Sequence, residues 1–241
     1  SLTGYVGNPI VVGTVGLLII VGGIGFIVIH DLLQYRRTKK LLLHTRIVIV
    51  STVSLILVGM AFTAVCEWNN PFTLGGLSGT GERLGAAWFH SVSCRTAGFN
   101  VFPLEPMHDI TKILSSLLMF VGAAPGSTGG GIKCTTFAVI FMTVYSVVRG
   151  DEDTVIFRRK VEKSAVYKSL AVMILGILAV TITAACIVAT MSGTHAVTGV
   201  DALFESVSAF ATVGLSAGIS AVASTLSRTL LIFEMYIGRL G

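Results

Sequence analysis

Three long apolar runs constrain what this chain can fold into. Residues 10–29, 47–66 and 169–191 contain no Asp, Glu, Lys or Arg. An α-helix rises 1.5 Å per residue, so about 20 apolar residues cross the hydrocarbon core of a bilayer. Only 12% of the residues are charged, about half the ~25% typical of soluble domains. The pattern indicates a polytopic membrane protein and excludes a disordered chain, a basic nucleic-acid-binding domain and an ordinary cytosolic enzyme.

Charge placement predicts an orientation for these spans. Two loops, 30–46 and 149–168, carry eleven of the 17 Lys and Arg residues, and basic loops stay on the cytoplasmic side. The first span would then run from outside to inside, which places the N-terminus outside. A further apolar segment, 229–241, reaches the end of the sequence. We therefore expect this chain to be part of a longer protein.

A short repeat stands between the spans. Residues 89–98 read FHSVSCRTAG and residues 204–214 read FESVSAFATVG, so both copies carry F-x-S-V-S followed by Thr-x-Gly. The apolar stretches that contain them, 86–95 and 201–211, would reach only ~15 Å as helices, about half the hydrocarbon thickness. We predict two re-entrant half-helices, the second capped by Asp201.

The residues after each half-helix are candidates for an ion path. A half-helix entering from outside directs its partly negative C-terminal end to the membrane centre, where cations are favoured. Backbone carbonyls of residues 96–100 and 212–216 would replace the hydration shell of a potassium-sized ion. The alternative is two amphipathic surface helices ended by glycine caps. Two copies in matching positions favour the pore interpretation.

A glycine-rich segment interrupts the apolar stretch between Lys112 and Arg149. The sequence GAAPGSTGGG at 122–131 cannot continue a stable helix. Irregular backbone at membrane depth borders a water-filled path or is buried in protein, although a passive helix kink is the alternative. Intramembrane charges indicate function: we expect Lys133 to hold this segment through a carbonyl or a carboxylate.

Three further charges admit specific pairings. Glu234 lies deep in the last apolar segment, with Lys133 or a partner as candidate contacts. Arg95 stands beside the first Thr-x-Gly segment, and we predict that it pairs with Glu205 of the other half-helix.

The segments CRTAGFN (94–100), GSTGGGIK (126–133), RGDEDTVIFRR (149–159), ATVGLS (211–216) and MYIGRLG (235–241) resemble the Trk/Ktr/HKT superfamily of potassium transporters. They are most similar to the bacterial Ktr-type membrane subunit. The resemblance implies an all-α polytopic membrane protein of tandem helix–pore loop–helix units around one potassium-channel-like pore. Residues 1–45 would end the second unit, 46–149 form the third, 150–165 form a cytoplasmic loop, and 166–241 form a truncated fourth unit.

The resemblance also implies roles for individual residues. A selectivity filter would comprise Thr96, Ala97, Gly98, Phe99, Thr212, Val213, Gly214 and Leu215. An intramembrane gate would comprise Gly122, Pro125, Gly126, Ser127, Thr128, Gly129, Gly130, Gly131, Lys133 and Arg239, the last from the final helix.

The same resemblance implies ions and partners. The transported ion would be K⁺, with Na⁺ as a further candidate, and no organic cofactor or resident metal is expected. The implied partners are membrane lipid, a second membrane subunit in a homodimer, and a cytosolic ring of nucleotide-binding regulatory subunits of the Ktr or Trk type. The implied location is the bacterial inner membrane.

Two competing functions have sequence signatures of their own. A sodium-coupled transporter with broken helices is the main alternative, but it would show inverted repeats, whereas these copies run in the same direction. A phosphate-binding loop requires G-x-x-x-x-G-K-[ST]; here Ile132 separates Gly131 from Lys133, and Cys134 replaces the hydroxyl. No Ser-His-Asp or paired-carboxylate pattern supports an enzyme.

Overall fold

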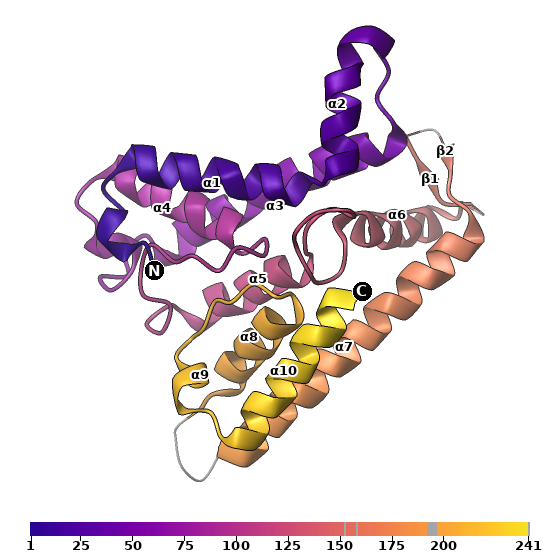
Figure 1. Ribbon diagram of the computed structural model, residues 1–241. Coiled ribbons are helices and arrows are strands. Elements are labelled where there is room, and N and C mark those ends of the chain that lie inside the picture. The colour runs from indigo at the N-terminus through magenta and orange to yellow at the C-terminus, as the bar shows by residue number, and fades with distance from the viewer. Residues whose placement is uncertain (152, 158, 192–196, 241) are drawn as a thin grey trace.

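The computed structural model describes residues 1–151, 153–157, 159–191 and 197–240, so positions 152 and 158 of the second basic loop lie outside the described residues. The described part is mostly helical (Figure 1). In chain order its helices are α1 (Pro9–Ile24), α2 (Phe26–Thr38), α3 (Leu43–Glu67), α4 (Thr80–Ser93), α5 (Asp109–Phe120), α6 (Cys134–Arg149), α7 (Lys163–Met191), α8 (Gly199–Phe210), α9 (Ile219–Val222) and α10 (Thr225–Leu240). Short 3₁₀ turns occupy Thr3–Tyr5 and Leu74–Gly76.

Within the described residues, two helices are long and apolar enough to cross a membrane. They are α3, with 25 residues, and α7, with 29 residues, which confirms helical runs at 47–66 and 169–191. The predicted uninterrupted span at 10–29 is wrong, because α1 and α2 meet at Gly25 with a bend of 94°. Gly25 adopts φ +88°, a backbone angle that residues with a Cβ rarely adopt. If the bent pair of α1 and α2 is regarded as a single broken span, it is the third candidate span of the described residues.

The repeat organises the tertiary structure into two similar groups. In the first, the half-helix α4 packs against α3 and α1; in the second, α8 packs against α7, α10 and α5. Figure 1 shows α8 beside α10, with α5 next to it; α5 contacts both α8 and α3 and so joins the two groups. Phe89 and Phe204, the first residues of the two F-x-S-V-S copies, are fully buried in one shared apolar core. Each half-helix is therefore anchored by the same aromatic position.

The half-helices begin and end at positions different from those predicted. Helix α4 begins at Thr80, six residues before the predicted start, and α8 begins at Gly199. The N-cap of α8 is Thr198, not Asp201, and its Oγ1 accepts a hydrogen bond from Asp201 N at 3.1 Å. Asp201 lies instead in the first turn, where its carboxylate accepts from Thr198 Oγ1 at 2.7 Å. This reciprocal pairing resembles a capping box and explains the earlier start.

The structure also contains a small element that the sequence did not predict. Strands β1 (Val155–Ile156) and β2 (Arg159–Lys160) form an antiparallel hairpin between α6 and α7. Figure 1 shows this hairpin at the junction of the two helices, far from the half-helices. The fold is therefore mostly helical with one short β-hairpin.

Candidate functional site: two Thr-x-Gly segments and a glycine-rich loop

The two Thr-x-Gly segments share an unusual backbone. Thr96 and Thr212 adopt φ values of +69° and +54°, and Gly98 and Gly214 adopt +75° and +89°. A threonine at positive φ is rare, because its branched side chain is strained there. The same strained threonine followed two residues later by a left-handed glycine occurs in both copies. The sequence repeat is therefore also a repeat of backbone conformation.

The two segments lie side by side. A Cβ built on Gly98 would stand 2.2 Å from the carbonyl oxygen of Val213, and one built on Gly214 would lie 4.0 Å from Gly98 Cα. No side chain fits at the first position without movement of the neighbouring backbone. The structure thus brings together the central residues of the predicted filter from both copies.

The serines of the repeat fix each half-helix to the long helix before it. Ser91 Oγ donates to the Ile56 carbonyl of α3 at 2.9 Å, and Ser206 Oγ donates to the Val180 carbonyl of α7 at 2.9 Å. Both serines are buried. Buried hydroxyls require such partners. The first serine of each copy therefore joins its helix to the long helix before it, a role that the sequence pattern did not reveal.

The glycine-rich loop lies directly against both segments. It spans residues 121–133 between α5 and α6 and closes through a parallel bridge between Val121 and Ile132. A Cβ on Gly129 would stand 2.4 Å from Thr96 Oγ1, and one on Gly130 would stand 2.3 Å from Thr212 Oγ1. The predicted helix interruption is confirmed. Its consecutive glycines permit close approach to the two strained threonines.

The same loop contacts the break between α1 and α2. Ala124 N donates to Gly23 O at 3.0 Å, and Phe26 N donates to Gly126 O at 3.2 Å. A Cβ on Gly25 would lie 2.7 Å from Pro125 O. The bend in the first apolar run is therefore where the loop docks, which explains why 10–29 is not one straight helix.

Two cations hold the loop through its carbonyls. Lys133 Nζ donates to Gly129 O at 2.9 Å, and Arg239 Nη1 of α10 donates to Thr128 O. Gly131 N also donates to the Gly238 carbonyl at 3.1 Å. The expected carbonyl contact of Lys133 is confirmed, and Arg239 reaches the loop from the last helix. The loop thus has fixed contacts to α1, α2 and α10.

The pairings considered for Glu234 and Arg95 are wrong. Glu234 is buried, and its two carboxylate oxygens lie 2.8 and 3.0 Å from Ser206 Oγ, whose single proton is shared between them and the Val180 carbonyl; Lys133 bonds elsewhere. Glu205 accepts from Ala217 N at 3.2 Å and from Ser220, so it holds the loop after the second Thr-x-Gly segment. Arg95 is buried, and its Nε and Nη2 have no hydrogen-bond partner in the described part of the chain. The partners of Glu234 and Glu205 thus depend on how the last helix and the loop after α8 pack against α8.

Two polar contacts between helices and loops were not predicted from the sequence. Glu67, fully buried at the end of α3, accepts hydrogen bonds from four residues: Asn70, Thr73, His108 and Thr111. Lys112 of α5 pairs with Asp201 of α8 at 2.7 Å. The signal for Glu67 was a carboxylate that directly follows a 20-residue apolar run.

Known proteins are similar to this chain in sequence and in fold. A model of the TrkH family, described as a cation transport protein, matches residues 1–241. The Ktr system potassium uptake protein B of Bacillus subtilis is 39% identical over 248 residues, which cover 100% of this chain and 53% of that protein. The protein of the same name from Vibrio alginolyticus is 38% identical and covers 100% of this chain and 52% of that protein. The chain therefore spans about half the length of these relatives.

A solved structure supports the same assignment at the level of the fold. The crystal structure of the potassium transporter TrkH from Vibrio parahaemolyticus superposes with a TM-score of 0.67 over 93% of this chain and 48% of that chain, at 16% identity. At this identity the likeness concerns the fold. Together with the family match over every residue, it shows that this chain belongs to the TrkH family of cation transport proteins and is a multi-pass membrane protein.

Proposed function

We propose that this chain is part of the ion-translocating membrane subunit of a potassium uptake system. The observation that carries the proposal is the pair of Thr-x-Gly segments, which lie side by side with matching positive-φ residues at the ends of two half-helices. The names of the relatives support potassium as the ion. No catalytic function is proposed.

In this proposal the two segments form half of a selectivity filter. Backbone carbonyls around Gly98 and Gly214 would bind dehydrated K⁺, and the C-terminal ends of α4 and α8 would favour a cation there. The helices belong to helix–pore loop–helix units, with 1–45 ending the second unit, 46–149 forming the third and 166–241 contributing to the fourth. The remaining filter segments would come from parts of the protein outside this chain.

The glycine-rich loop is proposed as an intramembrane gate. Its position supports the role, because Gly129 and Gly130 approach Thr96 and Thr212 closely enough to obstruct an ion path beneath them. The hydrogen bond from Arg239 to Thr128 O would hold the loop in place. Movement of the loop would then require loss of this contact and of those with α1 and α2.

The proposed assembly includes components outside this chain. The relatives' designation as proteins of a Ktr system supports a membrane subunit within a multicomponent uptake system. We propose a homodimer of membrane subunits with a cytosolic nucleotide-binding ring on the basic face formed by 30–46 and 149–168. Sodium is proposed as a coupling or co-permeant ion.

Rubidium uptake tests the proposed function. The complete gene that contains this segment is expressed with its regulatory partner in bacteria that lack potassium transport, and uptake is competed with K⁺ or Na⁺. We expect K⁺ to block uptake and Gly98→Asp to abolish it at unchanged membrane abundance. Uptake indifferent to Gly98→Asp would overturn the filter assignment and favour a broken-helix transporter.

A separate variant tests the gate. Arg239→Gln removes the cationic donor to Thr128 O, so we expect Rb⁺ flux to rise by about threefold to tenfold, corresponding to roughly 0.7–1.4 kcal/mol of lost loop stabilisation. Arg228→Gln, on the same helix but bonded to Ala221 O outside the loop, is the matched control. Equal flux in both variants would contradict a gating role for the Arg239 contact.

A further inference from the structure

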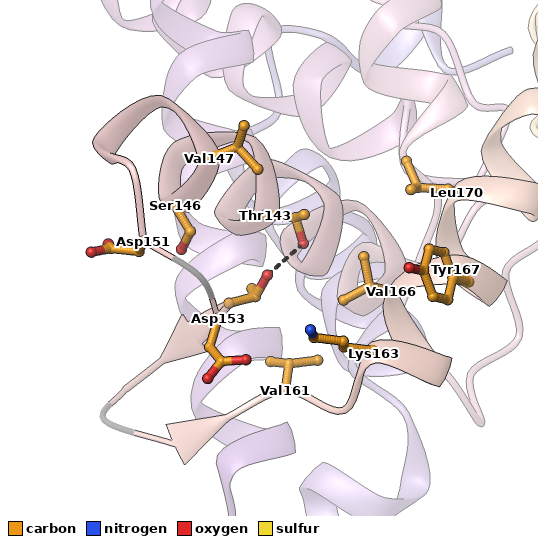
Figure 2. A pocket seen from close by; sticks show the side chains of 11 residues that line it. Thr143, Ser146, Val147, Asp151, Asp153, Val161, Lys163, Val166, Tyr167 and Leu170 are labelled. Carbon is orange, nitrogen blue, oxygen red and sulfur yellow. Dashed lines mark hydrogen bonds between the residues drawn. The ribbon is translucent and has the colours of Figure 1, made fainter.

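A cavity of about 290 Å³ lies between α6, the β-hairpin segment and α7. It is remote from the Thr-x-Gly segments and none of its lining residues belongs to the glycine-rich loop. Figure 2 shows its side chains converging from three elements: Ser146 and Val147 come from α6, Val161 from the connection, and Lys163 and Tyr167 from the start of α7. The proposed ion path makes no use of this cavity, while much of its lining belongs to the loop 149–168 on the face proposed to meet the cytosolic ring.

The polar groups directed into the cavity are donors without protein partners. Figure 2 shows the Lys163 ammonium pointing toward the centre of the group, with the Tyr167 hydroxyl on the same side. Ser146 lines the cavity although the residue is only 5% exposed. Among the described residues, none of these three side chains forms a hydrogen bond or ion pair. Ser146 is buried, whereas Lys163 and Tyr167 are exposed to solvent, Tyr167 at 69%, so an anionic group in the cavity would replace water at these two donors.

The acidic residues of the lining do not neutralise this charge. Asp153 pairs with Lys160 at 2.6 Å, and Figure 2 shows the Asp151 carboxylate directed away from the other side chains. Thr143 and Thr154 bond to each other at 3.1 Å. Within the described lining, the free charge that faces the cavity is therefore the positive charge of Lys163.

The remaining lining is apolar and comes from membrane helices. Val147 on α6 and Val166 and Leu170 on α7 complete the wall, and α7 is long and apolar enough to span the bilayer. The cavity thus joins an apolar wall to an ammonium and two hydroxyl donors. This combination suits a phosphate that is attached to an apolar chain, since basic pockets between transmembrane helices bind lipid headgroups.

We propose that this cavity binds the phosphodiester headgroup of an anionic glycerophospholipid. Lys163 supplies the counter-charge, Ser146 and Tyr167 donate to phosphate oxygens, and the acyl chains run along Val166 and Leu170. The volume is just below the ~300–1,000 Å³ of whole-ligand pockets, so it fits a headgroup with its chains outside. The same phosphate chemistry occurs in soluble glycerol 3-phosphate, and the experiment separates the two sources.

Native mass spectrometry of the complete membrane subunit tests the proposal. The protein in detergent is titrated with dioleoyl phosphatidylglycerol, with dioleoyl phosphatidylcholine as the comparison lipid. We expect Lys163→Gln to weaken retention of phosphatidylglycerol at least fivefold. Lys168→Gln makes the same charge change on α7 at a residue that is exposed, as Lys163 is, but lies outside the cavity lining, and we expect less than a twofold effect. Equal retention in both variants would overturn the site.

Two further measurements locate the ligand and identify its source. A photoactivatable phosphatidylglycerol should label peptides within residues 143–170, and the label should be lost in Lys163→Gln and in Ser146→Leu, which fills the cavity without changing charge. Melting temperatures of both variants verify folding. If glycerol 3-phosphate binds with the same Lys163 dependence and the lipid does not, the site takes a soluble phosphate. Binding of neither, or labelling elsewhere only, refutes the phosphate site.

Discussion

Substituting alanine for each of the two glycines of the proposed filter should reduce transport to different extents. Gly98 and Gly214 both adopt positive φ, at +75° and +89°, and a left-handed conformation costs a residue with a Cβ about 1–2 kcal/mol. This strain alone corresponds to a factor of about 5–30 in the population of the native conformation. We therefore expect Gly214→Ala to lower Rb⁺ uptake within that range.

Gly98→Ala carries a second penalty. Its Cβ would stand 2.2 Å from Val213 O, whereas the Cβ of Gly214→Ala would meet only Gly98 Cα, at 4.0 Å. A normal carbon–oxygen contact is about 3.3 Å or longer, so the Val213 carbonyl must move by roughly 1 Å. That carbonyl belongs to the neighbouring Thr-x-Gly segment, part of the proposed filter. We expect Gly98→Ala to take up Rb⁺ at least tenfold more slowly than Gly214→Ala.

The assay uses initial Rb⁺ uptake normalised to the amount of membrane-inserted protein. Gly85→Ala is the matched control, because Gly85 lies within α4 and its backbone has no positive φ. A Cβ at this position would meet no heavy atom of the described residues within 4 Å, and alanine also favours the helix. This variant should transport at the native rate. Equal effects of Gly98→Ala and Gly214→Ala, or native uptake by Gly98→Ala, would refute the close approach of the two segments.

Two further predictions concern polar contacts that join the helices. Lys112→Met, Asp201→Asn and the double variant should show a coupling energy of about 1–2 kcal/mol, because their ion pair is largely buried; additive shifts in melting temperature would contradict a direct interaction. Ser206→Ala removes the donor to Glu234 and to the Val180 carbonyl, so it should cost about 1–3 kcal/mol of stability. The loss should be partly restored by Glu234→Gln in the same protein, and thermal unfolding that shows no restoration would count against a destabilised carboxylate.

The strongest local patterns predicted well which segments form helices, but they predicted poorly where those helices begin. The charge-free runs at 47–66 and 169–191 became α3 and α7, because twenty apolar residues without a breaker leave few alternatives to a helix. The break at 122–131 was equally clear from its proline and glycines. The N-cap of α8 was misplaced by three residues, since Thr198 and Asp201 are both good capping residues and only the backbone decides between them.

The repeat by itself predicted two equivalent short helices. F-x-S-V-S followed by Thr-x-Gly indicated two equivalent half-helices, and the structure shows equivalent anchoring through Ser91 and Ser206. The sequence could not reveal the receiving carbonyls, because Ile56 and Val180 contribute only backbone atoms. Side-chain chemistry specifies a donor, whereas the position of a backbone acceptor depends on how two helices pack.

Tertiary structure alone decided the partners of the buried charges and the course of the first apolar run. Glu234, Glu205 and Arg95 were assigned plausible opposite charges by sequence, but Glu234 contacts Ser206 of α8 and Glu205 contacts the loop after α8. Gly25 appeared to be one more glycine in an apolar helix, yet it bends the chain where the glycine-rich loop docks. Composition and periodicity determine which segments enter a membrane as helices; contacts between distant segments determine where those helices break and which polar groups meet.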